Sequence, residues 1–230
     1  MTATEVGPYS PSGTDPTLLP LISLIEAASA TGGIPSIAPG LRLDEGMTVR
    51  ELATAPYTVL GELIEETAAQ WNAPRHVAAT LWWKGFSYWS TAPIALGWAL
   101  NGFFPALTAD NTLVQRLSGE PRFVVGTRDL VPATDVRATL LDLHTPLIDA
   151  LAKTARAGRR NLWGSVAESL THPLSVFAEL LPGTPDAAAL LALAGAPVSG
   201  LMELNPARRR TCCLWATLPD AEACATCCLN

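Results

Sequence analysis

The sequence predicts a mainly α-helical fold with one small β-hairpin, an α+β class, and a distinct segment at the C-terminal end. Apolar residues recur at helical spacing through most of the 230 residues, and one stretch near 112–126 has the pattern of paired strands. All five cysteines lie in the last 19 residues. We therefore expect a flexible arm over 1–15, a mostly helical body over 16–205 and a cysteine-bearing segment over 206–230.

The composition excludes several classes of protein. Hydrophobic residues make up 49% of the chain and charged residues 16%, which is too apolar for disorder and sufficient for a sizeable core. The formal net charge is −6, whereas a nucleic-acid-binding protein normally presents a basic face. We therefore expect no nucleic-acid partner. The 19 prolines argue against long coiled coils.

The first part of the body contains two stretches with helical spacing of apolar residues and one signal for the start of a helix. The first pattern ends at Gly32-Gly33 and the second lies between 57 and 72. Thr48 followed by Glu51 is typical of a capping box that opens a short helix. The apolar positions of the two patterns are Leu18, Ile22 and Ile25, and then Leu60, Ile64, Ala68 and Trp71.

Residues 85–109 carry no charge, and this stretch is long enough to cross a membrane. Prolines, glycines and hydroxyl-bearing residues interrupt this stretch, and Lys84 precedes it directly. We therefore expect two buried helices with a break near Pro93 or Gly102, and no transmembrane span.

In the second half of the body, the sequence pattern predicts a hairpin followed by three helices. Strand patterns flank Ser118-Gly119-Glu120-Pro121, which predicts the turn of a hairpin over 112–126. Helical spacing then returns in two long stretches, with Pro146 a candidate kink and Pro173 an expected interruption. A short helix over 186–194 follows Pro182-Gly183. The apolar positions of the long stretches are Val136, Leu140, Leu143, Leu147 and Leu151, and Trp163, Val166, Leu170, Leu174, Phe177 and Leu181.

Motifs of common enzyme chemistries are missing from the body. The sequence contains no Gly-x-Gly-x-x-Gly or Walker-type phosphate loop, no Gly-x-Ser-x-Gly elbow and no His-Glu-x-x-His. The three histidines, His76, His144 and His172, stand singly in helical stretches, and we expect them to pack or cap rather than bind a metal. Nothing before residue 205 indicates an enzyme.

The cysteines are the strongest functional signal in the chain. They cannot join distant segments by disulfides, because none precedes Cys212. The N-terminal residues lack the basic start of a secretory signal, so we expect a cytoplasmic protein with reduced thiols. The ten residues between the pair Cys212-Cys213 and the pair Cys224-x-x-Cys227 are sufficient to fold back and bring four thiolates together.

The spacing of the cysteines favours an iron–sulfur cluster over zinc. Side chains of adjacent cysteines diverge and hold a single tetrahedral ion poorly, whereas two sulfide-bridged irons offer two separate targets. A structural zinc site and a redox dithiol remain as alternatives. Spacing alone does not distinguish a two-iron from a four-iron cluster.

The C-terminal segment resembles the FhuF family of ferric-siderophore reductases. The resemblance rests on Arg209-Arg210-Thr211-Cys212-Cys213, Leu218-Pro219-Asp220 and Cys224-x-x-Cys227, with weaker likeness in Leu162-Trp163-Gly164-Ser165 and in 81–100. It implies that Cys212, Cys213, Cys224 and Cys227 bind a [2Fe-2S] cluster. Cys228 departs from the family motif and is a spectator, an alternative ligand to Cys227 or a source of ligand swapping.

The resemblance implies an oxidoreductase that reduces Fe(III) held by a hydroxamate-type siderophore in the cytoplasm and releases Fe(II). The transfer would be outer-sphere, one electron at a time through the cluster. Because the chain lacks a nucleotide-binding motif, it needs an external one-electron donor such as a ferredoxin, a flavodoxin or a reductase serving one. Two other functions remain open: an iron–sulfur electron carrier or redox or iron sensor, and a helical binding protein with a structural zinc tail.

Several side chains near the cysteines are candidates for contact with substrate or donor. Arg209 and Arg210 precede the first cysteine pair and either serve the cluster and its partners or are solvated charges. Trp215 lies between the pairs and either shields the cluster or packs against the body. Aromatic residues that form either a siderophore cleft or core are Trp82, Trp83, Tyr88, Trp89 and Trp98.

Overall fold

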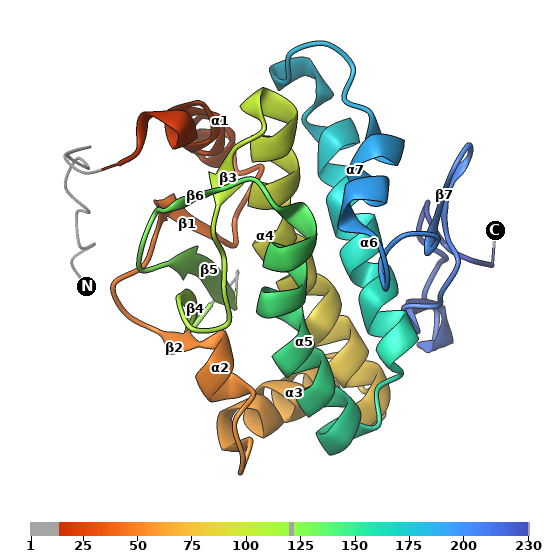
Figure 1. Cartoon of the computed structure of the whole chain (residues 1–230). Coiled ribbons are helices and arrows are strands. Elements are labelled where there is room, and N and C mark those ends of the chain that lie inside the picture. Colours follow the sequence, from red (N-terminus) through yellow and green to blue (C-terminus); the bar gives the residue numbers. More distant parts are fainter. Residues whose placement is uncertain (1–13, 120–121, 230) are drawn as a thin grey trace.

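The computed structural model describes residues 14–119 and 122–229, and most of them are helical (Figure 1). The predicted arm over 1–15 lies almost wholly outside the described residues. The helices are η1 (Pro16–Leu18), α1 (Leu19–Ala30), α2 (Val49–Leu52), α3 (Thr58–Trp71), α4 (Arg75–Asn101), α5 (Val136–Ala155), α6 (Arg159–Val176), η2 (Ala178–Leu180), α7 (Ala187–Ala194) and η3 (Trp215–Thr217). The strands are β1 (Ile37–Arg42), β2 (Met47–Thr48), β3 (Phe104–Pro105), β4 (Thr112–Arg116), β5 (Phe123–Thr127), β6 (Pro132–Ala133), β7 (Met202–Leu204) and β8 (Ala207–Arg209). The predicted α+β class is confirmed.

Helix α4 is the centre of the body, and it contacts α6 along much of its length as well as α1, α3 and α5. Of the two predicted positions for a break, Pro93 is wrong and Gly102 is right, because α4 continues through Pro93 and ends at Gly102, which adopts a left-handed conformation with φ 83°. The expected second helix after the break is also wrong, because the chain there forms β3 and a loop. Pro93 lacks one backbone N–H donor, but its neighbours on α4 are buried against the surrounding helices. This tertiary packing stabilises the helix more than the missing hydrogen bond weakens it.

The remaining helix predictions are largely confirmed. Leu18, Ile22 and Ile25 are buried at α1, and Thr48 and Glu51 form the expected capping box at α2. Asp186 caps α7 with its side chain. Helix α6 continues through Pro173 and ends three residues later at Val176, so the expected interruption is displaced toward the C-terminus.

The predicted hairpin exists as β4 and β5, with Val114 opposite Val125. It is part of a four-stranded sheet in the order β1-β5-β4-β2, in which β1 runs parallel to β5 and β2 antiparallel to β4. The sequence did not predict β1, because Pro39 and Gly40 lie inside it and both residues are rare within strands. The long-range pairing with β5 therefore decides its conformation.

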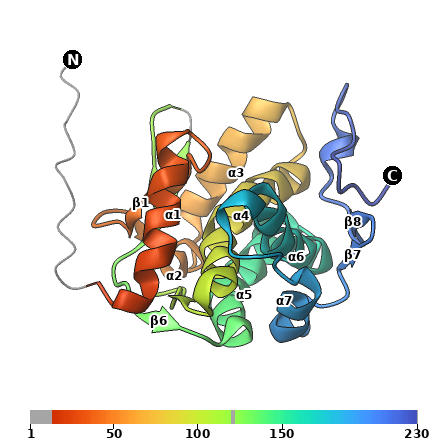
Figure 2. The same ribbon diagram turned by 90° about the horizontal axis from the view of Figure 1, so that it is seen from above.

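The sheet and the C-terminal segment lie on opposite sides of the helices, as both ribbon views show (Figures 1 and 2). Strands β7 and β8 form a small antiparallel hairpin that contacts α6. After β8, Thr211 lies against Gly164 of α6, and Thr226 hydrogen-bonds to Glu168 of the same helix. Helix α6 therefore contacts the cysteine-bearing segment at several positions.

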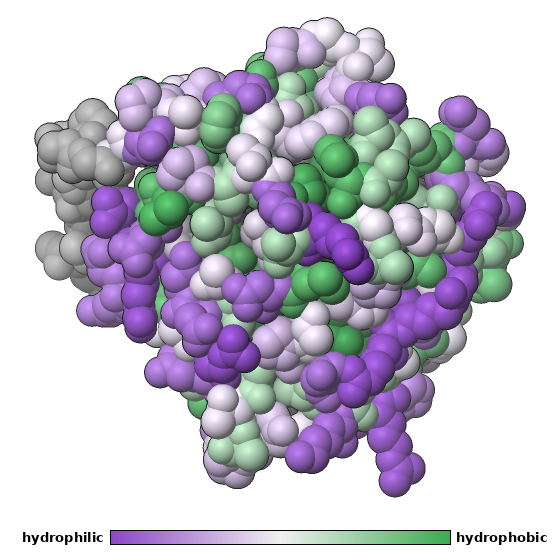
Figure 3. All heavy atoms as spheres, viewed as in Figure 1, coloured by the Kyte–Doolittle hydropathy of each residue, from purple (hydrophilic) through white to green (hydrophobic). Residues whose placement is uncertain are grey.

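The surface in Figure 3 is a mixture of hydrophilic and hydrophobic residues, with apolar residues visible in the area of α7. Leu193 of α7 is among the exposed large hydrophobic residues. In the part of the chain that the structure describes, no helix combines the length and apolarity needed to cross a bilayer. The uncharged stretch in α4 is instead mostly buried within the protein.

Candidate functional site

The C-terminal segment meets α6 at a close approach between Gly164 and Thr211. A side-chain carbon added at Gly164 would overlap the Oγ1 atom of Thr211. Glycine is therefore required here for Thr211, and hence for the adjacent Cys212, to lie against the helix. This contact gives Leu162-Trp163-Gly164-Ser165 a physical role, since that sequence forms part of the surface on which the cysteine segment rests.

Arg209 fastens the same segment by hydrogen bonds inside the protein. Its side chain is almost fully buried, and it donates to Glu168 Oε2 at 3.2 Å and to Ser165 Oγ at 3.1 Å. It also donates to the backbone oxygen of Asn161 at 3.2 Å and to Thr211 Oγ1 at 3.4 Å. The guanidinium therefore points toward α6 and away from solvent, and it acts as an internal tether that holds the segment against this helix.

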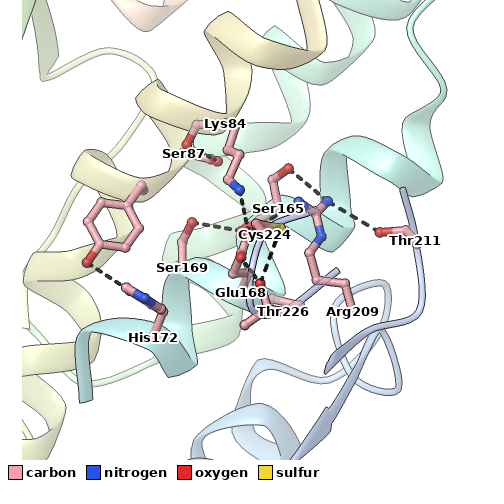
Figure 4. Close-up of polar contacts among 12 residues, drawn as sticks. Lys84, Ser87, Ser165, Glu168, Ser169, His172, Arg209, Thr211, Cys224 and Thr226 are labelled. Carbon is pink, nitrogen blue, oxygen red and sulfur yellow. Dashed lines mark hydrogen bonds and ion pairs between the residues drawn. The ribbon is translucent and has the colours of Figure 1, made fainter. Parts of the chain in front are cut away.

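Glu168 connects three elements through one carboxylate (Figure 4). Besides Arg209, its Oε2 atom faces the Lys84 ammonium of α4 at 3.7 Å, and its Oε1 atom accepts a hydrogen bond from Thr226. A buried carboxylate is stable only when it is paired and hydrogen-bonded. Here two cations pair with it, and one hydroxyl donates a hydrogen bond to it. Because Thr226 stands between Cys224 and Cys227, Glu168 fixes the position of the second cysteine pair as Arg209 fixes the first.

The backbone brings the two cysteine pairs together. The N–H of Arg209 donates to the backbone oxygen of Thr226 at 2.9 Å, and Cys227 donates to the oxygen of Cys224 at 2.9 Å to close a turn. Between the pairs the chain reverses, and the indole of Trp215 donates to the backbone oxygen of Glu222 at 3.0 Å. The fold-back that the sequence predicted between the two cysteine pairs therefore has a defined hydrogen-bonded geometry.

The five thiols are enclosed to different degrees. Cys213 and Cys227 are buried, whereas Cys212, Cys224 and Cys228 are half-buried. Cys228 shares hydrogen bonds with the thiols of Cys212 and Cys227. Burial together with these two neighbours raises the pKa of Cys228.

Cys213 lies in a different electrostatic environment. Burial raises the pKa of its thiol, while the backbone N–H of Trp215 and the charges of Lys84 and Arg209 lower it, and Cys224 is also within interaction range. The backbone N–H of Leu214 donates to the sulfur of Cys212 at 3.3 Å. Amide donors and cations beside sulfur stabilise thiolates, which are the form that binds a metal.

The thiols form two groups rather than one centre. Within residues 14–119 and 122–229, no three His, Cys, Asp or Glu side chains form a group that could hold a metal ion. Cys228 interacts with Cys212 and with Cys227, whereas Cys213 interacts with Cys224. Two groups of thiols in one short segment, partly enclosed and supplied with N–H donors, fit a cofactor with two metal ions.

A cavity of about 490 Å³ opens beside Cys224, between α3, α4, α6 and the C-terminal segment. The rings of Trp71 and Trp215 meet edge to face with their centroids 4.9 Å apart, which connects α3 to the segment. Lys84 and Glu168 bring charge to the cavity. The other residues that line it are Leu81, Gly85, Tyr88, Trp89, Ser169, His172, Ala225 and Thr226.

A second cavity of about 570 Å³ adjoins the first and extends toward the β4–β5 hairpin. The two cavities share Trp71, Leu81, Gly85 and Trp89. Together they form a cleft along α4 that is aromatic next to Cys224 and more polar near the hairpin. The volume of the cleft is in the range of small-molecule sites.

The aromatic candidates divide between core and cleft. Trp83 is fully buried and donates to the backbone oxygen of Leu162, and Trp82 is also buried in the core, although it borders the second cavity. Tyr88 and Trp89 line the cleft, while Trp98 is half-buried against the core. Trp71, which the helical pattern assigned to the buried face of α3, is 39% exposed and lines both cavities.

The remaining candidates lie at the surface of the segment. Arg210 is exposed and forms an ion pair with Glu203 at 3.2 Å, and Arg208 pairs with the same carboxylate at 3.1 Å. The Arg208 guanidinium, followed by that of Arg210, holds the pKa of Glu203 below its usual range. Trp215 packs against Trp71 and lines the cavity next to Cys224.

Sequence reasoning missed Lys84, Glu168 and His172 as parts of this site. Lys84 was noted only as the end of an uncharged stretch, and Glu168 stands alone in an apolar helical pattern. A single carboxylate on the buried face of a helix is a signal that could have identified Glu168, because buried charge needs a partner. No local pattern connects these residues to cysteines that lie at least forty positions away.

Comparison with known proteins identifies the C-terminal segment. Residues 209–229 match the family model described as the FhuF 2Fe-2S C-terminal domain. No curated protein matches the chain. The match begins at the buried tether Arg209, includes all five cysteines, and confirms the resemblance found in the sequence. The C-terminal segment is therefore a FhuF-type iron–sulfur domain, and it indicates a [2Fe-2S] cluster as the cofactor of this protein.

Proposed function

We propose that this protein is a cytoplasmic ferric-siderophore reductase that transfers one electron to Fe(III) in a hydroxamate-type chelate and releases Fe(II). One observation carries the proposal. Cys224 of the iron–sulfur domain borders an aromatic cavity of about 490 Å³, so a chelate in this cavity would lie next to the cluster-binding segment. Outer-sphere transfer requires such proximity and no covalent step.

Cys212, Cys213, Cys224 and Cys227 are the ligands we propose for the [2Fe-2S] cluster. Their grouping supports this, because the thiols of Cys212 and Cys227 both interact with that of Cys228, and the thiol of Cys213 interacts with that of Cys224. Each iron of such a cluster takes two protein sulfurs. When bound, the cluster supplies one electron at a time. Arg209, Glu168 and Thr226 hold the two halves of the site against α6.

The cavity suits a ferric hydroxamate chelate. Its wall combines flat aromatic surface from Trp71, Trp89 and Trp215 with the ammonium of Lys84, so it offers apolar area to the organic part of the ligand and positive charge to its oxygens. Hydroxamate oxygens are hard anionic donors that bind Fe(III) far more strongly than Fe(II). Adding one electron is therefore sufficient to loosen the metal.

An external donor must supply the electron. Since the sequence has no nucleotide-binding motif, we propose a ferredoxin, a flavodoxin or a reductase serving one. Arg210 is exposed two residues before the first cysteine pair and is available to an acidic partner. Charge of this kind accelerates encounter more than it increases affinity.

A stopped-flow experiment tests the proposal. The dithionite-reduced, cluster-loaded protein is mixed anaerobically with the ferric complex of a linear trihydroxamate, and the visible absorbance of the cluster is followed. We expect rapid reoxidation of the cluster with one equivalent of Fe(II) formed, and no reaction with the redox-inert Ga(III) complex. A cluster that stays reduced in excess ferric chelate would overturn the reductase function and favour an electron carrier or sensor.

A cavity variant connects this activity to the proposed site. Trp71→Ala removes an exposed aromatic wall, and we expect KM for the ferric chelate to rise about three- to tenfold, because one aromatic contact contributes about 0.5–1.5 kcal/mol. Leu193→Ala is the matched control, since Leu193 is 53% exposed on α7 and does not line the cavity. An unchanged KM in Trp71→Ala would place the chelate elsewhere.

A further inference from the structure

His172 and Tyr88 form a polar pair on the wall of the cavity beside Cys224. The Nδ1 atom of His172 and the hydroxyl of Tyr88 are 3.2 Å apart, and the rings meet edge to face with centroids 5.6 Å apart. Tyr88 comes from α4, and His172, which Figure 4 labels, comes from α6; both helices line the cavity. The hydrogen bond therefore holds the imidazole in a fixed orientation.

Neither Glu168 nor the phenol of Tyr88 is suited to deliver a proton to a ligand in the cavity. Glu168, one turn earlier on α6, already binds Arg209, Lys84 and Thr226. Burial, and after it the charge of Glu168, raises the pKa of Tyr88 to about 12, so the phenol remains protonated at neutral pH. The other polar or charged groups on the cavity wall are Lys84 of α4, Ser169 of α6, and Cys224 and Thr226 of the C-terminal segment.

Reduction of a ferric hydroxamate creates a need for protons. The electron adds one negative charge to the complex, and each hydroxamate oxygen that leaves the iron is basic. Without protonation that oxygen binds the metal again. An acid positioned at the oxygen prevents this and accelerates release of Fe(II).

We propose that His172 is a catalytic residue that donates a proton to a chelate oxygen as the reduced iron leaves, with Tyr88 positioning the imidazole. This inference rests on the proposed reductase function. In the step, one Fe(II)–oxygen bond breaks and one O–H bond forms, and the imidazolium becomes a neutral imidazole. The electron comes from the reduced cluster. Because His172 is at the exposed rim of the cavity, solvent restores its proton.

The first test separates electron transfer from iron release. Reoxidation of the reduced cluster by ferric trihydroxamate is followed by absorbance, and free Fe(II) is trapped with a chromogenic Fe(II) chelator. We expect His172→Gln to leave cluster reoxidation within about twofold of the unchanged protein, while Fe(II) release becomes about 10- to 100-fold slower. The pH profile of Fe(II) release should differ between His172→Gln and the unchanged protein, because the variant lacks the proposed proton donor.

Two further variants, Tyr88→Phe and Val176→Ala, make the test more specific. Tyr88→Phe keeps the ring and removes the hydroxyl, so we expect a smaller slowing of Fe(II) release than in His172→Gln. Val176→Ala is the matched control, because Val176 is an exposed residue of the same helix that does not line the cavity. Equal rates and pH profiles of Fe(II) release in His172→Gln and the unchanged protein would overturn the role of His172.

Two further measurements do not depend on turnover. Binding of the Ga(III) trihydroxamate complex, measured by calorimetry, should change less than threefold in His172→Gln, because the proposed role is proton donation and not affinity. Added imidazole should restore Fe(II) release in His172→Gly, and no rescue would contradict general-acid catalysis. If the unchanged protein does not reoxidise its cluster with ferric chelate, the reductase function fails; if it does and only the His172 effects are missing, this inference alone fails.

Discussion

The helical body and the C-terminal segment are held together by different forces. In the body, Trp83, Phe86 and Ile94 of α4 are fully buried in one apolar core that also includes side chains from α1, α3, α5 and α6. No residue between 205 and 229 belongs to that core. The segment is attached instead by a close backbone approach at Gly164 and by the hydrogen bonds of Arg209, Glu168 and Thr226.

The difference predicts how each region responds to change. Apolar burial is spread over many side chains, so one substitution in the body removes a small share of its stability. The segment depends on a few directional contacts, and breaking one leaves a buried charge or a clash. We therefore expect single substitutions that detach the cysteines while the body stays folded.

The largest effect is expected for Arg209→Leu. This change leaves Glu168 buried with one cation fewer, and removing one partner of a buried ion pair costs about 3–5 kcal/mol. We expect loss of cluster absorbance and rapid proteolysis of the segment, with the helical circular dichroism signal of the body preserved. Arg210→Leu is the matched control, because its ion pair is exposed and contributes about 0–1 kcal/mol.

Gly164→Ala tests the close approach and should have the next largest effect. The added carbon overlaps Thr211, and overpacking of this kind costs about 1–3 kcal/mol. Cluster occupancy should fall, and adding Thr211→Gly should restore it by removing the overlapping atoms. Gly61→Ala in α3 is the matched control, because its new carbon would have an ordinary contact at 3.7 Å. Full occupancy in Gly164→Ala alone would show that the segment does not depend on this contact.

His144 makes the stability of the body depend on pH. Burial lowers the pKa of this histidine to about 3 from 6.5, so between these pH values the unfolded chain binds a proton that the folded protein excludes. Stability therefore falls as the pH falls from 6.5 toward 3, by about 1.4 kcal/mol per pH unit. Denaturant unfolding followed by circular dichroism measures it, and His144→Gln should remove this slope. An equal slope in both proteins would assign it to other groups.

The smallest effect is expected for Cys228→Ser. Cys228 is a neighbour of Cys212 and Cys227 but lies outside the proposed ligand set. We therefore expect the cluster absorbance per protein to change by less than about a fifth, because substitutions away from functional residues usually have small effects. Cys227→Ser is the matched comparison and should lose the cluster. The reverse result would make Cys228 the fourth ligand. Electron paramagnetic resonance of the reduced protein would show which cluster each variant retains.

Local pattern was sufficient to predict most of the helices. Leu140, Leu143 and Leu147 repeat at helical spacing and are buried in α5, and the capping box at Thr48 and Glu51 is present. Pattern failed where long-range packing outweighs local preference. Helix α4 continues through Pro93 because its surroundings stabilise it, and β1 forms around Pro39 and Gly40 because β5 is beside it.

For the site, the sequence by itself determined the iron–sulfur domain. The two cysteine pairs lie close together in the chain, so their spacing can be recognised without knowledge of the fold. Tertiary structure alone decided what surrounds those cysteines. Lys84, Glu168 and His172 come from helices distant in sequence, and only the packing of α4 against α6 brings them to the cavity beside Cys224. Side-chain convergence of this kind depends on three-dimensional contact, which residue spacing along a chain does not encode.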